Sequence, residues 1–143
     1  MNSIIITGYL LLGTWQDIKK RKISRNYLLF GGILGAVIRI ISYRKENLVF
    51  AEWLVAFFPG IIILVIAKLT KEKMGVGDGY ILMVLANYMN LWEICMLLQT
   101  AIILTSLFAL LLICNRKVSK EYPIPFLPFL WIAHMVLWRI GYV

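Results

Sequence analysis

Acidic side chains are scarce in this 143-residue chain, which has seven Asp and Glu residues against fifteen Lys and Arg. Charged residues of both signs make up 15% of the chain, whereas hydrophobic residues make up 62%. That composition argues against a soluble domain, whose surface must be hydrated. The net charge is +8, but the basic residues fall in short clusters beside apolar runs and form no continuous basic face. We therefore expect no nucleic-acid partner.

Ligands for a metal or a disulfide framework are also missing. The two cysteines, Cys95 and Cys114, form no CxxC pair and have no Cys/His spacing of the kind that holds zinc. We predict that both are small apolar packing residues, and that the protein uses neither a metal nor another cofactor. The one histidine, His134, lies in the last apolar run, and we interpret it as a hydrogen-bonded packing residue.

Apolar runs fill most of the chain and break at charged or turn-forming clusters. A bilayer core of about 30 Å takes roughly 20 apolar residues per helix, and backbone inside it must satisfy its own hydrogen bonds. The runs predict an all-α, polytopic membrane bundle of about six transmembrane helices, forming a single domain over residues 1–143. The first run lacks the features of a removable signal peptide, so we interpret it as the first span. The expected spans cover residues 2–18, 26–42, 50–69, 79–91, 93–114 and 123–142.

Two breaks in this pattern predict local structure. The segment around Asn87, Asn90 and Glu93 is polar, and the apolar stretch that contains it is too long for one span, which predicts a tight hairpin there. The pair Pro59-Gly60 predicts a kink in the third span.

Basic residues indicate the orientation of the spans. Most of the fifteen follow the first, third and fifth spans, whereas Arg39, Arg44, Lys45 and Arg139 fall at the opposite ends. Because Lys and Arg are enriched in cytoplasmic loops, both termini are predicted to be exoplasmic.

Two acids differ from the other five. The glutamates lie in or beside predicted loops, whereas Asp17 closes the first apolar run and Asp78 opens the fourth. On the predicted topology both face the cytoplasmic side, where they can meet. A carboxyl group at membrane depth is costly unless it is paired or hydrated, so both are functional candidates. Two simpler interpretations stay open: Asp78 could cap the fourth helix, and Asp17 could be an interfacial residue neutralised by the lysines after it.

Glycines surround the second acid in the segment Met74-Gly75-Val76-Gly77-Asp78-Gly79. Glycine allows two backbones to approach closely and can adopt a positive φ. Irregular chain at membrane depth is tolerated only where it is buried in protein or lines a wet cavity. We therefore predict an active-site loop of Gly75, Val76, Gly77 and Gly79 around an aqueous pocket that holds Asp78.

The first acid begins the segment Asp17-Ile18-Lys19-Lys20-Arg21-Lys22-Ile23-Ser24-Arg25-Asn26, and the second ends Gly75-Val76-Gly77-Asp78. These segments resemble the two signatures of the type IV prepilin peptidases, and Pro125-Phe126-Leu127-Pro128-Phe129 resembles the closing segment of that family. The resemblance implies a membrane aspartic endopeptidase in which Asp17 and Asp78 are catalytic, in a short form without the methylating domain. Three departures concern substrate contacts and leave the two acids intact: Asn26 comes one residue late, Tyr80 replaces a common Lys, and Ser24 replaces a commoner Pro.

The resemblance also implies a substrate and a mechanism. The substrate would be a type IV prepilin-like precursor, of the Tad/Flp type or a pseudopilin, cut after its basic leader at the cytoplasmic face of the inner membrane. One carboxylate would activate water while the other, protonated, polarises the carbonyl, because like charges a few Å apart share one proton. Which acid carries that proton stays open. Possible contacts to substrate or anionic lipid are Lys19, Lys20, Arg21, Lys22, Arg25 and Asn26.

Other functions stay open beside this one. An archaeal-type preflagellin peptidase, or another GxGD intramembrane protease, would share the two acids but differ in substrate. A small ion- or proton-translocating membrane subunit would use the acids to bind ions. A catalytically idle component of a pilus assembly machine would need neither. The bilayer and a precursor substrate are the expected partners, and the pattern does not predict an oligomeric state.

Overall fold

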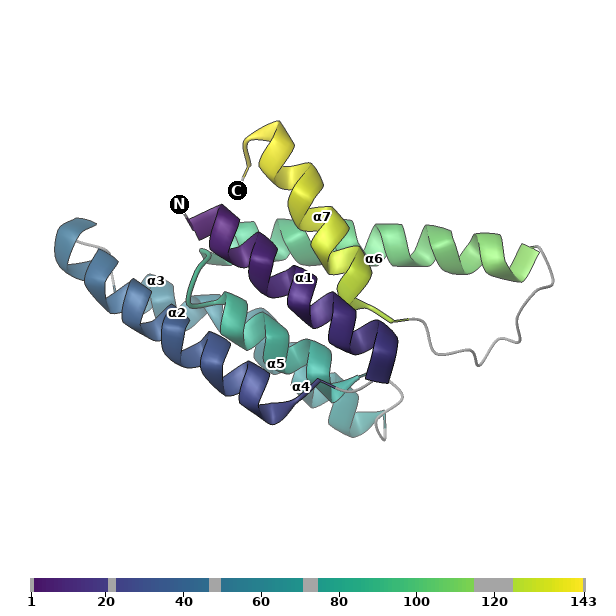
Figure 1. Cartoon of the computed structure of the whole chain (residues 1–143), viewed down its shortest axis with the longest axis horizontal. Coiled ribbons are helices and arrows are strands. Elements are labelled where there is room, and N and C mark those ends of the chain that lie inside the picture. The colour runs from purple at the N-terminus through teal and green to yellow at the C-terminus, as the bar shows by residue number, and fades with distance from the viewer. Residues whose placement is uncertain (1, 21–22, 47–49, 71–74, 115–124, 143) are drawn as a thin grey trace.

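A computed structural model describes residues 2–20, 23–46, 50–70, 75–114 and 125–142, and this part of the chain is built from helices (Figure 1). Two of the helices belong to one segment that is interrupted only at Phe57. The helices are α1 (Asn2–Lys20), α2 (Arg25–Glu46), α3 (Phe50–Ala56), α4 (Phe58–Leu69), α5 (Val76–Leu85), α6 (Leu91–Cys114) and α7 (Leu127–Ile140).

The short helix α5 forms the centre of the bundle. Ile81, Leu82 and Leu85 are buried almost completely, and α5 is flanked by α4 and α2. Helices α1 and α7 pack along each other, and α7 also packs on α6. Both termini lie at the same end of the bundle (Figure 1).

Helices α4 and α5 approach each other closely because each presents a glycine to the other. A Cβ atom on Gly60 would lie 3.0 Å from the Met83 nitrogen and 3.1 Å from the Gly79 carbonyl oxygen. A Cβ atom on Gly79 would lie 2.7 Å from Leu64 Cγ. Small residues at such crossings are typical of membrane helices, where close packing replaces the hydrophobic effect as the driving force.

The kink predicted at Pro59 is confirmed. Helix α3 ends at Ala56 and α4 begins at Phe58, with the proline in the first turn of α4. Proline has no N–H to continue the hydrogen-bond ladder of the preceding helix, so the helix breaks just before it.

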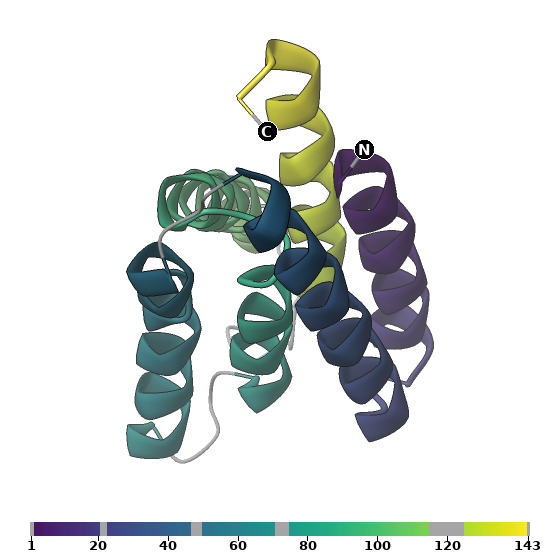
Figure 2. The same cartoon turned by 90° about the vertical axis from the view of Figure 1, so that its left-hand side faces the viewer.

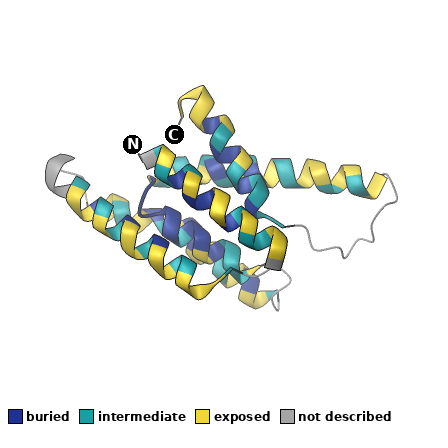
Figure 3. Ribbon diagram, viewed as in Figure 1, coloured by how far each residue is buried: buried dark blue, intermediate teal, exposed yellow. Residues whose placement is uncertain are grey.

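The outer surface of the bundle is apolar. Leu12, Ile33, Leu69 and Leu111 are all more than half exposed, and exposed positions cover the outer face of α2 and the far part of α6 (Figure 3). Residues 25–42, 50–69 and 91–114 are long and apolar enough to cross a membrane, and α5 and α7 are shorter apolar helices. The chain is therefore an all-α membrane helical bundle, as the sequence predicted.

The turn predicted near Asn90 is confirmed, but close antiparallel packing of the helices on either side is not found. The Glu93 carboxylate accepts a hydrogen bond from the Asn90 backbone N–H at 2.8 Å, which caps the start of α6. Helix α6 then runs across the bundle against α7 and α3, and Figure 2 shows it nearly end-on. The reason is that α2 and α4 already cover α5, so α6 must bury its first turns elsewhere.

A buried cation fixes this turn to α2. The Arg39 side chain is only 9% exposed, and its guanidinium group donates a hydrogen bond to Asn90 Oδ1 at 3.2 Å. A charged group in a membrane helix is costly unless it is paired. The positive-inside pattern assigned Arg39 to one end of the bundle, and the structure adds a tertiary contact that the pattern did not predict.

Candidate active site

Asp17 and Asp78 lie at the same end of the bundle. Asp17 is in the last turn of α1 and Asp78 is in the first turn of α5, and both helix ends point away from the two chain termini (Figure 1). The two carboxyl groups are near enough for the charge of Asp17 to repel a charge on Asp78. The fold therefore brings together the two acids that the sequence singled out.

The Asp17 carboxylate is held by the start of another helix. It accepts a hydrogen bond from the backbone N–H of Leu127, the first residue of α7, at an N–O distance of 3.2 Å. The first N–H groups of a helix have no partner within the helix, so this contact satisfies one of them. The interpretation of Asp17 as a merely interfacial residue does not account for this tertiary contact.

The interpretation of Asp78 as a helix cap is wrong. Gly75 occupies the N-cap position of α5, and no side chain caps that helix. Asp78 is three residues further on, and its backbone N–H donates to the Gly75 carbonyl at 3.0 Å. Its carboxyl group is therefore free from capping, because the helix already begins within the glycine segment.

The predicted irregular loop around Asp78 is also wrong within the described residues. Val76, Gly77 and Gly79 belong to α5, and Gly141 is the one glycine with a positive φ in the described part of the chain. A helix satisfies its own backbone hydrogen bonds, which favours it over irregular chain at membrane depth.

These glycines instead allow neighbouring side chains to lie close to the backbone, because glycine has no Cβ atom. A Cβ atom on Gly75 would lie 2.9 Å from Asp78 Oδ2, and a Cβ atom on Gly77 would lie 2.8 Å from Ile23 Cδ1. The first contact would press on the acid itself, so Gly75 leaves space for the carboxyl group. An open surface groove of about 400 Å³ lies along α7, where Trp131, Ile132 and Met135 help to line it, and it includes neither acid. The predicted aqueous pocket therefore stays a prediction.

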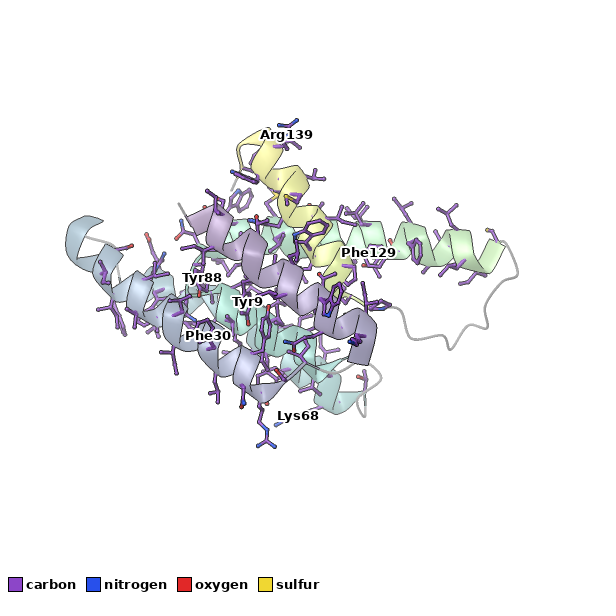
Figure 4. All side chains as sticks on the ribbon, in the orientation of Figure 1. Tyr9, Phe30, Lys68, Tyr88, Phe129 and Arg139 are labelled. Atoms are coloured by element: carbon purple, nitrogen blue, oxygen red, sulfur yellow. The ribbon has the colours of Figure 1, made fainter. Side chains whose placement is uncertain are left out.

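Asp78 lies slightly inside the end of the bundle. Its neighbour Gly79 packs against Leu64 of α4, and α4 continues one more turn to Lys68. At 1.5 Å per residue, Gly79 is about 6 Å inward of Lys68, and Asp78, one residue nearer the end of the bundle, is about 4.5 Å inward. Figure 4 shows Lys68 at this end of the molecule and Arg139 at the opposite end.

The predicted basic contacts lie beside this end. Lys19, Arg25 and Asn26 are exposed, whereas Arg21, Lys22 and the side chain of Lys20 lie outside the described residues. The Ser24 hydroxyl accepts a hydrogen bond from the Tyr27 N–H at 3.4 Å and so caps α2. Ser24, at the position where proline is commoner, therefore acts as the N-cap of α2.

Three tyrosines connect α2 to α1 and to the turn after α5, and no sequence pattern pointed to them. The rings of Tyr9 and Tyr27 stack with centroids 4.4 Å apart, and the Tyr27 hydroxyl donates to the Tyr9 carbonyl oxygen. The Tyr88 hydroxyl donates to the Gly31 carbonyl oxygen at 2.9 Å. Tyr9 and Tyr88 lie between α1, α2 and α5 in Figure 4. Their hydrogen bonds could not be predicted, because the acceptors are backbone carbonyl groups of residues far away in the sequence.

The remaining polar residues have structural positions. His134 is fully buried, with Nε2 3.2 Å from the Ser3 carbonyl oxygen, which confirms its packing role. Cys95 and Cys114 are free and exposed, so their predicted packing role is wrong, because α6 buries only a small part of its surface. The described part of the chain holds no group of three or more side chains that could bind a metal ion.

Comparison with known proteins gives one match. A model of the type IV leader peptidase family matches residues 4–114, a range that includes both acids, the basic segment between α1 and α2, and the glycine segment. Comparisons with curated proteins and with solved structures give no match. Since the matched range covers most of its length, the chain belongs to the type IV leader peptidase family.

Proposed function

We propose that this protein is an aspartic endopeptidase that removes the basic leader from type IV prepilin-like precursors, of the Tad/Flp type or pseudopilins. Asp17 and Asp78 are the catalytic pair of a single membrane domain over residues 1–143. One observation carries the proposal: the only two aspartates of the chain lie at one end of the bundle, where the charge of one acts on the other.

The reaction follows from two neighbouring carboxyl groups that share one proton. The charged carboxylate takes a proton from water. The resulting hydroxide attacks the carbonyl carbon of the peptide bond that joins the leader to the mature protein. The protonated carboxyl group gives its proton to the carbonyl oxygen at the same time. The tetrahedral diol then collapses: the leaving nitrogen takes a proton from the first acid, and the second acid recovers one from the diol. The carbon–nitrogen bond breaks, and the pair returns to its starting state.

The proposed orientation puts the acids at the cytoplasmic face of the inner membrane and both termini on the exoplasmic side. Exposed Lys19 and Arg25, and Lys68 at the end of α4, lie at the end of the bundle that carries the acids, and cytoplasmic loops are enriched in such residues. Because Asp78 is only about one turn inside this end, the substrate's apolar helix can stay in lipid while its leader reaches the acids.

The exposed basic residues next to Asp17 have a proposed role of their own. Lys19 and Arg25, with Lys20, Arg21 and Lys22 between them in sequence, hold anionic headgroups or an acidic residue of the mature pilin. A basic leader would be repelled by them. Replacing Lys19 and Arg25 together with Gln should weaken cleavage in anionic vesicles; an unchanged rate there would contradict this role.

A cleavage assay tests the function. Purified wild-type protein in lipid should shorten a prepilin-like precursor at the junction of its leader and its apolar helix, detected by mass spectrometry. Asp17→Asn and Asp78→Asn should each abolish the product, while Glu52→Gln, the same change at an exposed carboxyl group of α3, should cleave normally. A preflagellin precursor supplied in parallel distinguishes the two substrate classes. Full cleavage by either Asn variant would refute the catalytic pair.

A further inference from the structure

We infer that the backbone N–H of Leu127, at the start of α7, positions the Asp17 carboxylate and makes it the charged member of the pair, so that Asp17 activates the water and Asp78 carries the proton. This inference rests on the proposed function and goes beyond it, because it assigns separate roles to the two acids. It also brings into the site a helix that lies outside the range matched by the family model.

The first step of the argument is the hydrogen bond itself. A donor that points at a carboxylate stabilises the charged form over the protonated form. Asp17 accepts such a bond from Leu127, and no hydrogen bond within the described residues reaches the Asp78 carboxyl group. The starts of α5 and α7 favour charge on Asp78 and Asp17 respectively, but Asp17 also lies in the last turn of α1, where the helix dipole disfavours a negative charge, so helix dipoles do not single out Asp17 as the charged acid. The hydrogen bond from Leu127 does.

The second step is that Leu127 is held in place by two contacts on one face of α1. Its side chain is fully buried, and a Cβ atom on Gly13 would lie only 2.8 Å from Leu127 Cδ2. Gly13 precedes Asp17 by four residues, so the two positions lie on the same face one turn apart. The side chain of Leu127 thus packs at Gly13 while its N–H reaches Asp17, which fixes the carboxylate relative to α7.

The third step is the charge environment of Asp17. The ionisable group on α5 is Asp78, on which the charge of Asp17 acts, and the Tyr27 hydroxyl approaches from α2 at the level of Gly13. On α1 itself, Lys19 follows with an exposed side chain. The first turns of α7 carry no ionisable side chain before His134. The first turns of α7 therefore act on the charge of Asp17 through the backbone N–H of Leu127.

The roles assigned to the two acids determine the direction of each proton transfer. In the resting state Asp17 is a carboxylate and Asp78 a carboxylic acid. Asp17 takes the proton of the attacking water, and Asp78 gives its proton to the carbonyl oxygen. When the carbon–nitrogen bond breaks, the proton on Asp17 goes to the leaving nitrogen and Asp78 takes one from the diol. Leu127 touches no reacting atom and is a positioning residue.

The test replaces a single N–H group. Incorporating the α-hydroxy analogue of leucine at position 127 turns its amide into an ester and leaves the side chain unchanged. The same exchange at Phe129 is the matched control, because its N–H donates to the Phe126 carbonyl at 3.1 Å and does not reach the acids. Cleavage is then measured across pH, where the acidic limb of the profile reports the catalytic base and the basic limb reports the acid.

The position-127 ester should move the acidic limb upward by roughly one to two pH units and leave the basic limb in place, because a hydrogen bond to a charged group is lost. The Phe129 ester should leave both limbs unchanged. Movement of the basic limb alone would overturn the role assignment, and an unchanged profile would overturn the positioning role. Either result leaves the proposed function intact as long as Asp17→Asn remains inactive, so the two failures are distinguishable.

A second pair of variants covers the case in which the ester prevents folding. Gly13→Ala presses on Leu127 and should move the acidic limb in the same direction, whereas Gly8→Ala on the same helix meets nothing within 4 Å and should not. An identical pH profile in both alanine variants would also overturn the positioning role.

Discussion

Replacing Gly60 with Ala should impair cleavage although Gly60 lies outside the glycine segment around Asp78. The new Cβ would lie 3.0 Å from the Met83 nitrogen and 3.1 Å from the Gly79 carbonyl oxygen. Both are backbone atoms of α5, so relief requires the whole helix to recede by several tenths of an ångström. Since a misplacement of about 1 Å at a reacting group can cost about 100-fold in rate, we expect roughly a three- to tenfold loss of kcat.

The matched control for this prediction is Gly32→Ala on α2, whose Cβ would lie 3.9 Å from Val84 Cγ2, an ordinary contact. Both substitutions gain about 1 kcal/mol of helix propensity, which cancels in the comparison. Overpacking should therefore make the Gly60 variant less stable than the Gly32 variant by about 1–3 kcal/mol. Thermal unfolding in detergent and the cleavage rate measure the two effects. If the two variants were equally stable and equally active, the contact between α4 and α5 would not control the position of Asp78.

Two further predictions follow from the contacts of the described residues. Gly75→Ala would bring a Cβ to 2.9 Å from Asp78 Oδ2, whereas Gly77→Ala meets the flexible end of an isoleucine side chain at 2.8 Å. Cleavage should therefore fall further in the Gly75 variant, and a larger loss in the Gly77 variant would contradict the structure. Asn90→Ala removes the partner of the buried Arg39 guanidinium and should cost about 1–3 kcal/mol of stability. Adding Arg39→Met should restore part of the loss in thermal unfolding, while additive losses would show that the two side chains do not interact.

The helices and the two acids could be predicted from the sequence because both leave a strong local pattern. Apolar runs broken by charged clusters predicted where the helices lie, as the third span shows: it was expected over residues 50–69, and α3 and α4 together run from Phe50 to Leu69. Asp17 and Asp78 were recognisable because each acid lies at the edge of an apolar run. A carboxyl group is costly at that depth unless it is paired or hydrated, so it is a functional candidate.

What could not be predicted depends on contacts between distant segments. The glycine segment was expected to be a loop, since glycine is common in loops, but Gly77 and Gly79 are helical and serve close packing. The path of α6 depends on which faces of α5 are already covered. The hydrogen bond from Leu127 to Asp17 involves a backbone N–H, which every residue except proline carries, so no sequence pattern could reveal it.

The central claim is that Asp17 and Asp78 act as one unit with a shared proton. The chain contains no other aspartate, so ¹³C labelling of aspartate carboxyl groups yields signals from this pair alone. Their chemical shifts, followed across pH in lipid, report directly whether each carboxyl group is charged. We predict one charged and one protonated carboxyl group at neutral pH, and a change in the titration of each when the other is replaced by Asn. Two carboxylates that are both charged at neutral pH, and that titrate independently of each other, would contradict the account.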